Sequence, residues 1–194
     1  MGRIYYLMGK SASGKDRIYS ELLGNPTLSL KPLVLYTTRP IRTGEVNGQN
    51  YFFTDEEKLK ELRKQGRVIE ERCYQTVHGP WYYFTADDGQ FDTEEDLLGI
   101  GTLESYGNLR AYFGSDRIVP LLIDVEDGIR LKRAIAREEQ QEEPKYKELC
   151  RRFLADSEDF SEERIRELGI ADRITNNGTL EEGLEKVIAV MRKL

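Results

Sequence analysis

Runs of apolar residues alternate with amphipathic stretches along this 194-residue chain. Residues 3–8 and 117–123 are largely apolar, which is typical of short strands buried on both faces of a parallel sheet. Other stretches place apolar residues three or four positions apart, which is the spacing of one helix face. The alternation predicts an α/β fold with a mostly parallel central sheet. The predicted strands are 3–8, 33–37, 68–74, 81–85, 96–100 and 117–123. The predicted helices are 15–23, 54–66, 103–113, 126–141, 144–154 and one from 179 onward. Capping-box patterns at Thr54 and Thr179 mark the starts of two of these helices.

The composition fits a single globular domain with a charged surface. Hydrophobic residues make up 39% and charged residues 33%, and no apolar run reaches the length of a membrane span. The net charge of −6 argues against a general nucleic-acid binder but allows a local basic cleft for a small anion. Cys73 and Cys150 fit no metal motif, which predicts reduced thiols and a cytoplasmic location. We therefore expect no nucleic-acid or membrane partner, and the oligomeric state stays open.

The stretch GKSASGKD, from Gly9 to Asp16, nearly matches the phosphate-binding pattern G-x-x-x-x-G-K-[S/T]. It lies between a predicted buried strand and a predicted helix, which is the context that this loop requires. Glycines let backbone N–H groups surround phosphate oxygens, the helix N-terminus adds partial positive charge, and Lys15 reaches the β- and γ-phosphates. Asp16, however, stands where a Ser or Thr hydroxyl meets Mg²⁺. An ordinary tight turn with an exposed lysine is the weaker interpretation.

A second group of candidate anion-binding residues follows the predicted strand at 33–37. Arg39 and Arg42 lie in the stretch TTRPIRTGE, which Pro40 keeps extended, and Tyr51 comes shortly after. Because arginine makes forked contacts with phosphate, both guanidinium groups can converge on one anion. For two arginines alone, an ordinary solvated loop would be the favoured interpretation.

Together, these two segments resemble the guanylate kinase family. The family pattern is a phosphate-binding loop followed by TTR-x-x-R-x-G-E-x-x-G-x-x-Y, and this chain has GKSASGK followed by TTRPIRTGEVNGQNY. The resemblance extends more weakly along the rest of the chain. It includes Ile69-Glu70, the turn at 79–83, the lid arginines and the segment at 175–177.

The resemblance implies an enzyme that transfers a phosphoryl group from ATP, with Mg²⁺, to a nucleoside monophosphate, with GMP as the first candidate. It also implies a three-layer P-loop fold with a central parallel sheet, a small β-rich acceptor-binding subdomain and a helical lid. The whole chain, 1–194, would be one guanylate kinase-like domain. Its parts would be a core at about 1–33, 97–130 and 170–194, an acceptor-binding subdomain at about 34–90, and a lid at about 131–160.

The resemblance further assigns roles to individual residues. The ATP-binding residues would be Gly9, Ser11, Ala12, Ser13, Gly14, Lys15, Asp16 and Asn176. The acceptor-binding residues would be Arg39, Arg42, Glu45, Tyr51, Glu70, Tyr83 and Thr85, with Glu70 and Thr85 on the base. The catalytic residues would be Lys15, Arg42, Arg133, Arg137 and Arg152, with Arg151 as an alternative to Arg152, and Asp16 would hold the metal.

The segment LLGIG departs from the family at two functional positions. Gly99 and Gly101 stand where the family usually has aspartates, one near Mg²⁺ and one that reads the guanine amino group. Asp16 can replace the acid lost from the metal side, by binding Mg²⁺ directly or through water. Alternatively, Asp16 only favours the helix dipole from the first turn. Glu104 is a candidate for the missing base-reading acid, or simply another first-turn residue.

Two more departures leave the acceptor open. Leu35 replaces a serine near the acceptor phosphate, and the longer stretch from Glu70 to Tyr83 adds Arg72, Thr76 and His78. One alternative is the same fold with another acceptor, either another nucleotide or a phosphosugar. A second is a guanylate kinase-like module that binds nucleotide or protein with weak catalysis. The retained lysine and arginines argue against this module.

Arg130, Arg133 and Arg137 recur at helical spacing and form one basic face. Acidic residues follow directly, so spacing alone favours a solvated, salt-bridged surface. The family resemblance favours a lid over the transferred phosphoryl group, where cationic groups can contribute about 10³–10⁵ in rate.

Overall fold

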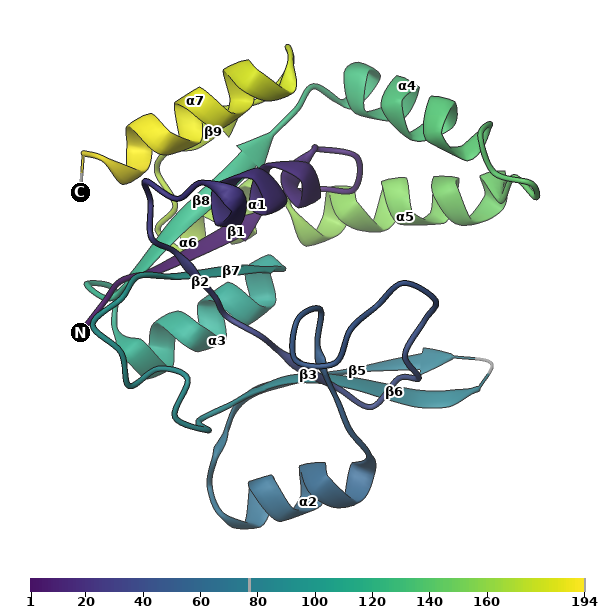
Figure 1. The fold of residues 1–194 in the computed structure, drawn as a ribbon. Helices are drawn as coiled ribbons and strands as arrows, with labels where there is room; N and C mark the ends of the chain where they lie inside the picture. The colour runs from purple at the N-terminus through teal and green to yellow at the C-terminus, as the bar shows by residue number, and fades with distance from the viewer. Residues whose placement is uncertain (77, 194) are drawn as a thin grey trace.

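Five parallel strands form the central sheet, in the order β2-β7-β1-β8-β9 (Figure 1). The computed structural model describes residues 1–76 and 78–193. Strand β1 lies in the middle and is buried along its whole length, as its apolar sequence predicts. Because all strands are parallel, their carboxyl ends share one edge, where loops can converge on a ligand. The strands are β1 (Ile4–Met8), β2 (Lys31–Pro32), β7 (Leu97–Gly101), β8 (Ile118–Asp124) and β9 (Arg173–Thr175).

Helices cover both faces of this sheet. On one face, α1 (Lys15–Gly24) and α7 (Leu180–Met191) pack on Tyr5 and Leu7 of β1. On the other, α3 (Leu103–Phe113) and α6 (Glu162–Glu167) share a core with the alternate residues of β1. The predicted three-layer α/β fold with a central parallel sheet is therefore confirmed. No helix within 1–76 and 78–193 has the length and apolar character needed to cross a membrane.

A second, smaller sheet is formed by the chain between β2 and β7. Its strand order is β4-β3-β6-β5, and α2 (Glu56–Lys64) covers it through Leu59 and Leu62. Its strands are β3 (Tyr36–Thr37), β4 (Phe52–Phe53), β5 (Val68–Thr76) and β6 (Gly79–Ala86). Helices α4 (Asp127–Glu138) and α5 (Tyr146–Asp159) pack against each other and extend to one side of the central sheet (Figure 1).

Some predicted elements differ from the structure. The stretch 33–37 is not one strand, because residues 33–35 connect the two sheets and only Tyr36 and Thr37 pair, in the second sheet. Asp55, not Thr54, caps α2, and its side chain accepts from the Lys58 N–H at 2.8 Å. The prediction missed β4, β9 and α6 because they are too short to show a period.

Candidate functional site

The loop between β1 and α1 has the curled backbone that phosphate binding requires. Gly14 has a φ of +88° and Ala12 a φ of +62°, a region that L side chains rarely occupy. A Cβ on Gly14 would lie 2.8 Å from Nδ2 of Asn176, so the space there is also restricted. Within the described part of the chain, no side chain caps α1. Its first N–H groups are therefore available to an anion.

Asn176 and Arg133 connect this loop to the segment after β9 through backbone carbonyls. The buried Asn176 side chain donates from Nδ2 to the Ser13 carbonyl at 2.8 Å. Arg133 donates from Nη1 and Nη2 to the carbonyls of Asn176 and Gly178, at 3.0 and 2.9 Å. In this conformation Asn176 positions the loop and Arg133 positions the segment after β9, and their predicted roles toward a nucleotide stay predictions.

Lys15 and Asp16 are the first two residues of α1, and their side chains differ in solvent exposure. Nζ of Lys15 lies 3.6 Å from Oδ2 of Asp16, and the two side chains are 19% and 81% exposed. In residues 1–76 and 78–193, no group of three His, Cys, Asp or Glu could hold a metal ion. Mg²⁺ bound to ATP needs only one or two carboxylates, because phosphate oxygens and water supply the other ligands. The exposed carboxylate of Asp16 fits that requirement.

Two predicted lid arginines lie beside the phosphate-binding loop. Arg137 of α4 and Arg152 of α5 line one cavity of about 100 Å³ that also reaches Ser11. Nε of Arg152 donates to Glu148 at 3.0 Å. Hydrogen bonds from Arg151 and Arg152 lower the pKa of Glu148 to about 2. The structure therefore brings these two arginines, from α4 and α5, into one cavity with Ser11 of the loop.

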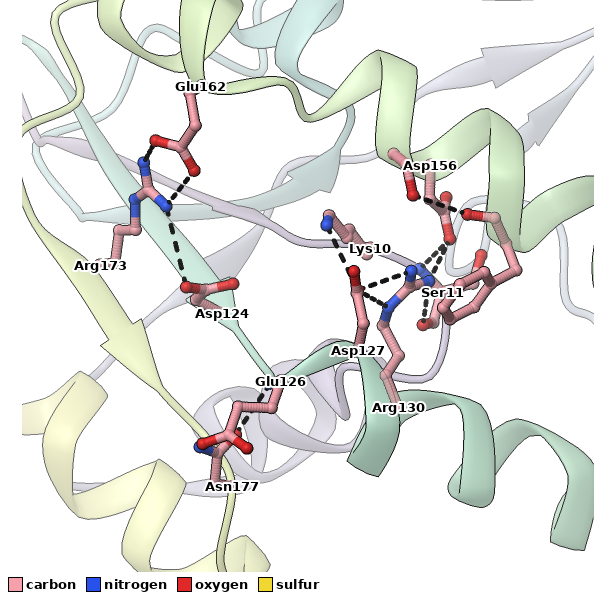
Figure 2. Close-up of polar contacts among 12 residues, drawn as sticks. Lys10, Ser11, Asp124, Glu126, Asp127, Arg130, Asp156, Glu162, Arg173 and Asn177 are labelled. Carbon is pink, nitrogen blue, oxygen red and sulfur yellow. Dashed lines mark hydrogen bonds and ion pairs between the residues drawn. The ribbon is translucent and has the colours of Figure 1, made fainter.

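A cluster that the sequence did not predict joins α5 to the loop (Figure 2). Oδ2 of Asp156 accepts from the Ser11 backbone N–H at 2.8 Å and from Nη1 of Arg130 at 2.9 Å. Arg130 is 1% exposed, donates to Asp127 at 3.0 Å and lies 3.9 Å from the centroid of the Phe153 ring. Arg130 has partners in the loop and in α5 as well as in its own helix. Helical spacing in the sequence indicates only a basic face, because it carries no information on contacts with other elements.

The predicted acceptor-phosphate residues meet in the second sheet and its loops. Arg39 is 4% exposed and makes two parallel bonds to Glu45, at 2.7 and 2.5 Å. Its guanidinium lies 5.1 Å from the Tyr51 ring centroid and 5.2 Å from that of Phe53. The rings of Tyr51 and Tyr83 are in edge contact at 5.7 Å. Arg39, Glu45, Tyr51 and Tyr83 thus form one cluster.

Glu45 organises the two arginines of this cluster. Besides Arg39, it accepts from the backbone N–H of Arg42 at 2.8 Å. The hydrogen bonds from Arg39, followed by the one from Arg42, hold the pKa of Glu45 at about 2. The Arg42 residue is exposed. Its guanidinium is therefore accessible to an incoming anion.

The base-reading end of the site differs most from expectation. Glu70 accepts from Oγ1 of Thr85 at 2.8 Å and from Nε of Arg72 at 3.1 Å, and its side chain is 0% exposed. The Tyr6 hydroxyl occupies the space beside Gly101, where an added Cβ would lie 2.1 Å from Oη. Direct contact between Glu70 and an acceptor, as predicted from the sequence, is not available in this conformation.

Comparison with known proteins relates the segment that contains the loop and the Arg39 cluster to a known family. Residues 1–88 match the family described as "Guanylate kinase". Over these residues the chain is similar to the guanylate kinase family. A guanylate kinase of Aliivibrio fischeri is 38% identical over 82 residues, which are 42% of this chain and 38% of that relative. One of Clostridioides difficile is 41% identical over 80 residues, or 40% and 38% of the two chains.

The match therefore spans well under half the length of these guanylate kinase relatives, and beyond it the likeness is one of fold. The crystal structure of guanylate kinase from Anaplasma phagocytophilum has a TM-score of 0.62 and 22% identity, covering 99% of this chain and 85% of that one. The phosphate-binding loop and the Arg39 cluster lie within 1–88. Helices α4 and α5 lie outside it.

Proposed function

We propose that this chain is a guanylate kinase family protein that phosphorylates GMP to GDP with ATP. The observation that supports this most strongly is a pair of separate anion sites in one chain. One is the β1–α1 loop with Lys15 and the uncapped start of α1. The other is the cluster of Arg39, Glu45, Tyr51 and Tyr83 in the second sheet. A phosphotransferase needs one such site for each substrate.

In this proposal the protein mainly positions the two phosphates and neutralises their charge. The loop N–H groups and Lys15 hold the β- and γ-phosphates of ATP. Arg39 and Arg42 hold the acceptor phosphate, with Tyr51 beside them, while Glu45 fixes the arginine geometry. No general base is needed, because a phosphate monoester, with a second pKa near ~6, is already a nucleophilic anion at neutral pH.

Two lid arginines and the metal complete the proposed mechanism. Arg137 and Arg152 lie on the lid side of the loop and would neutralise charge on the transferred group. When bound with ATP, Mg²⁺ supplies further neutralisation of the phosphate oxygens, and Asp16 is the residue that would hold it. The carboxylate of Asp16 is free to do so because it is largely exposed.

The proposal also covers the organisation and location of the protein. It divides one domain into a core, an acceptor-binding part at about 34–90 and a lid at about 131–160. The small hydrophobic core under α2 supports the acceptor-binding part, and the α4–α5 pair, which extends to one side of the central sheet (Figure 1), supports the lid. A cytoplasmic location is supported by Cys73 and Cys150, which are both free thiols.

The test is an ADP-release assay with ATP, Mg²⁺ and a panel of acceptors: GMP, dGMP, AMP, UMP, CMP and phosphosugars. Lys15→Ala protein is the blank, and Lys60→Ala, an exposed lysine on α2, is the matched control. We expect turnover with GMP in the wild type and in the control, and none in the blank. Absence of turnover with every acceptor would contradict the proposal.

A different acceptor in the same fold is the second candidate, and one observation favours it. Arg72 covers the Glu70 carboxylate that would otherwise accept hydrogen bonds from guanine. Turnover with a phosphosugar but not with a purine nucleotide would select this candidate.

A further inference from the structure

Arg72, and not Glu70, is the accessible member of a buried ion pair at the base end of the acceptor site. The Arg72 side chain is 8% exposed and that of Glu70 is 0% exposed. Both oxygens of Glu70 have partners, namely Thr85 and the Arg72 guanidinium. Of the two side chains, only that of Arg72 therefore has exposed surface.

The guanidinium of Arg72 has donors left for a ligand. It has five N–H groups and no acceptor. Nε and Nη2 bond to Glu70 at 3.1 and 3.4 Å, and Nη1 contacts Oγ1 of Thr102 at 3.5 Å. These contacts occupy three of the five donors. Burial opposes the charge, but the Glu70 carboxylate raises the pKa of Arg72 above its ordinary value, so the group stays a cation and a donor.

Arg72 contacts a residue that lines a large cavity, because its Nη1 lies 3.5 Å from Oγ1 of Thr102. Burial raises the pKa of Tyr51, while the charges of Arg39 and Arg72 both act to lower it, so both guanidinium groups are near this hydroxyl. Tyr74 is likewise coupled to Arg72, and its ring meets that of Tyr83 at 5.6 Å. Beyond Arg72, Thr102 and Tyr74 line a cavity of about 660 Å³, which has room for a purine base.

Positions 99 and 101 are glycines and carry no carboxylate. The hydroxyl of Tyr6 fills the position beside Gly101 and bonds to Oγ of Ser105 at 2.8 Å. A carboxylate accepts from the N1–H and 2-amino groups of guanine. A guanidinium donates to its O6 and N7, which is the commonest specific arginine–guanine contact. Adenine presents an amino donor at position 6 and opposes such a contact.

We propose that Arg72 reads the acceptor base, by donating to O6 and N7 of a 6-oxopurine. The acceptors are then 6-oxopurine nucleoside monophosphates as a class, GMP and IMP alike, because nothing in the contact senses the 2-amino group. This inference rests on the proposed kinase function and names the substrate class of its acceptor site. Arg72 is a specificity-determining residue in this scheme.

The first test uses the wild-type enzyme, so no variant needs to fold. kcat/KM is measured with ATP–Mg²⁺ and four acceptors: GMP, IMP, AMP and 2-aminopurine riboside monophosphate, which keeps the 2-amino group but lacks O6. We expect GMP and IMP to agree within about threefold. The two acceptors without O6 should be lower by roughly 5- to 150-fold, the range for one bidentate base contact.

The opposite pattern would overturn the inference while leaving the kinase function intact. If a carboxylate reads the N1–H and 2-amino groups, IMP, which lacks the 2-amino group, should be rejected by up to about 10⁴-fold relative to GMP. Repeating the panel with Glu104→Gln would then show whether Glu104, which also lines the cavity, is that carboxylate. Absence of turnover with all acceptors would instead contradict the proposed function itself.

A variant test removes the ion pair of Arg72 and Glu70 as a whole. The double variant Glu70→Gln/Arg72→Leu removes the pair without leaving a buried unpaired charge. We expect kcat/KM for GMP to fall about tenfold or more while that for AMP changes little, so that discrimination between the bases is lost. Arg63→Leu is the matched control, because Arg63 pairs with Glu71, an adjacent residue of β5. Retention of the GMP preference in a folded double variant would overturn the assignment.

Discussion

Tyr6 occupies the space that side chains at Gly99 and Gly101 would need. An added Cβ would lie 2.6 Å from Cδ2 of Tyr6 at position 99 and 2.1 Å from its Oη at position 101. Tyr6 is fully buried on β1, next to β7. A side chain at either glycine position would therefore clash with Tyr6. Restoring an acid at either position requires a smaller residue at position 6.

Gly101→Ala should lower the free energy of unfolding by about 2 kcal/mol, because overpacking a filled core typically costs ~1–3 kcal/mol. In the background of Tyr6→Phe the cost should be smaller, with a coupling of about 1 kcal/mol in a double-mutant cycle by urea denaturation. Gly128→Ala is the control: its Cβ would meet nothing within 4 Å, and helix propensity predicts a gain of about 0.5–1 kcal/mol. Additive effects at positions 6 and 101 would contradict the steric coupling.

Asp16→Ser should weaken metal binding to the ATP complex by about tenfold if the carboxylate holds Mg²⁺, because the variant loses a charged oxygen ligand. The readout is Mn²⁺ titration of the ATP complex by EPR, which does not depend on turnover. Asp16→Asn, which keeps the shape but not the charge, should show the same direction. Equal or tighter metal binding in both variants would show that Asp16 only begins a helix.

At the scale of elements, a carboxylate of α5 accepts a hydrogen bond from a backbone N–H of the phosphate-binding loop. Asp156 accepts from the Ser11 N–H, and Arg130 joins Asp156 to Asp127 at the start of α4. Helices α4 and α5 are therefore connected to the loop through hydrogen bonds as well as through their mutual packing. Arg133 has a related role on the other side, where it holds the segment after β9.

Arg130→Met should lower the free energy of unfolding by about 3 kcal/mol, because it leaves the Asp156 carboxylate without its buried cation. Asp156→Asn in the same chain should recover part of this loss. Arg151→Met is the control, since the exposed pair of Arg151 with Glu148 is expected to contribute only about 0–1 kcal/mol. Chemical denaturation of the four proteins measures these differences, and equal effects of Arg130→Met and Arg151→Met would argue against a buried connection.

At the scale of the whole molecule, two sheets bring two candidate anion sites into one chain. The central sheet presents the phosphate-binding loop at the carboxyl end of β1, and the second sheet presents the Arg39 cluster. The second cluster contains the cations Arg39 and Arg42, whose charges are offset when a phosphate or a carboxylate lies between them. Glu45 provides that carboxylate in the acceptor cluster.

The stability of the molecule should depend on pH through this carboxylate. The pKa of Glu45 is about 2 in the fold, against an ordinary 4.5, so its contribution is fully present above about pH 4.5 and disappears as the pH falls toward 2. The wild type should exceed Glu45→Gln in unfolding free energy at pH 6, and the difference should shrink toward zero near pH 2. Glu57→Gln, an exposed site on α2, is the control. A pH-independent difference would contradict the assignment.

Much of the fold could be predicted from the sequence because its signals are local. The buried strands at 4–8, 97–101 and 118–124 have continuous apolar sequences, and the capping box at Thr179 fixes the start of α7. The phosphate-binding loop is also local, since strand, glycines and lysine are contiguous. Elements of two or three residues, such as β4 and β9, have no period to detect.

The sequence by itself determined the parallel α/β layers, the phosphate-binding loop and the candidate acceptor arginines, because each depends on neighbours in the chain. Only the tertiary structure decided which groups face a ligand. Arg72 covers Glu70, Tyr6 fills the space at Gly101, and Asp156 bonds to the loop. These relations depend on pairing between distant strands and helices, and burial rather than residue type then decides which charge remains accessible.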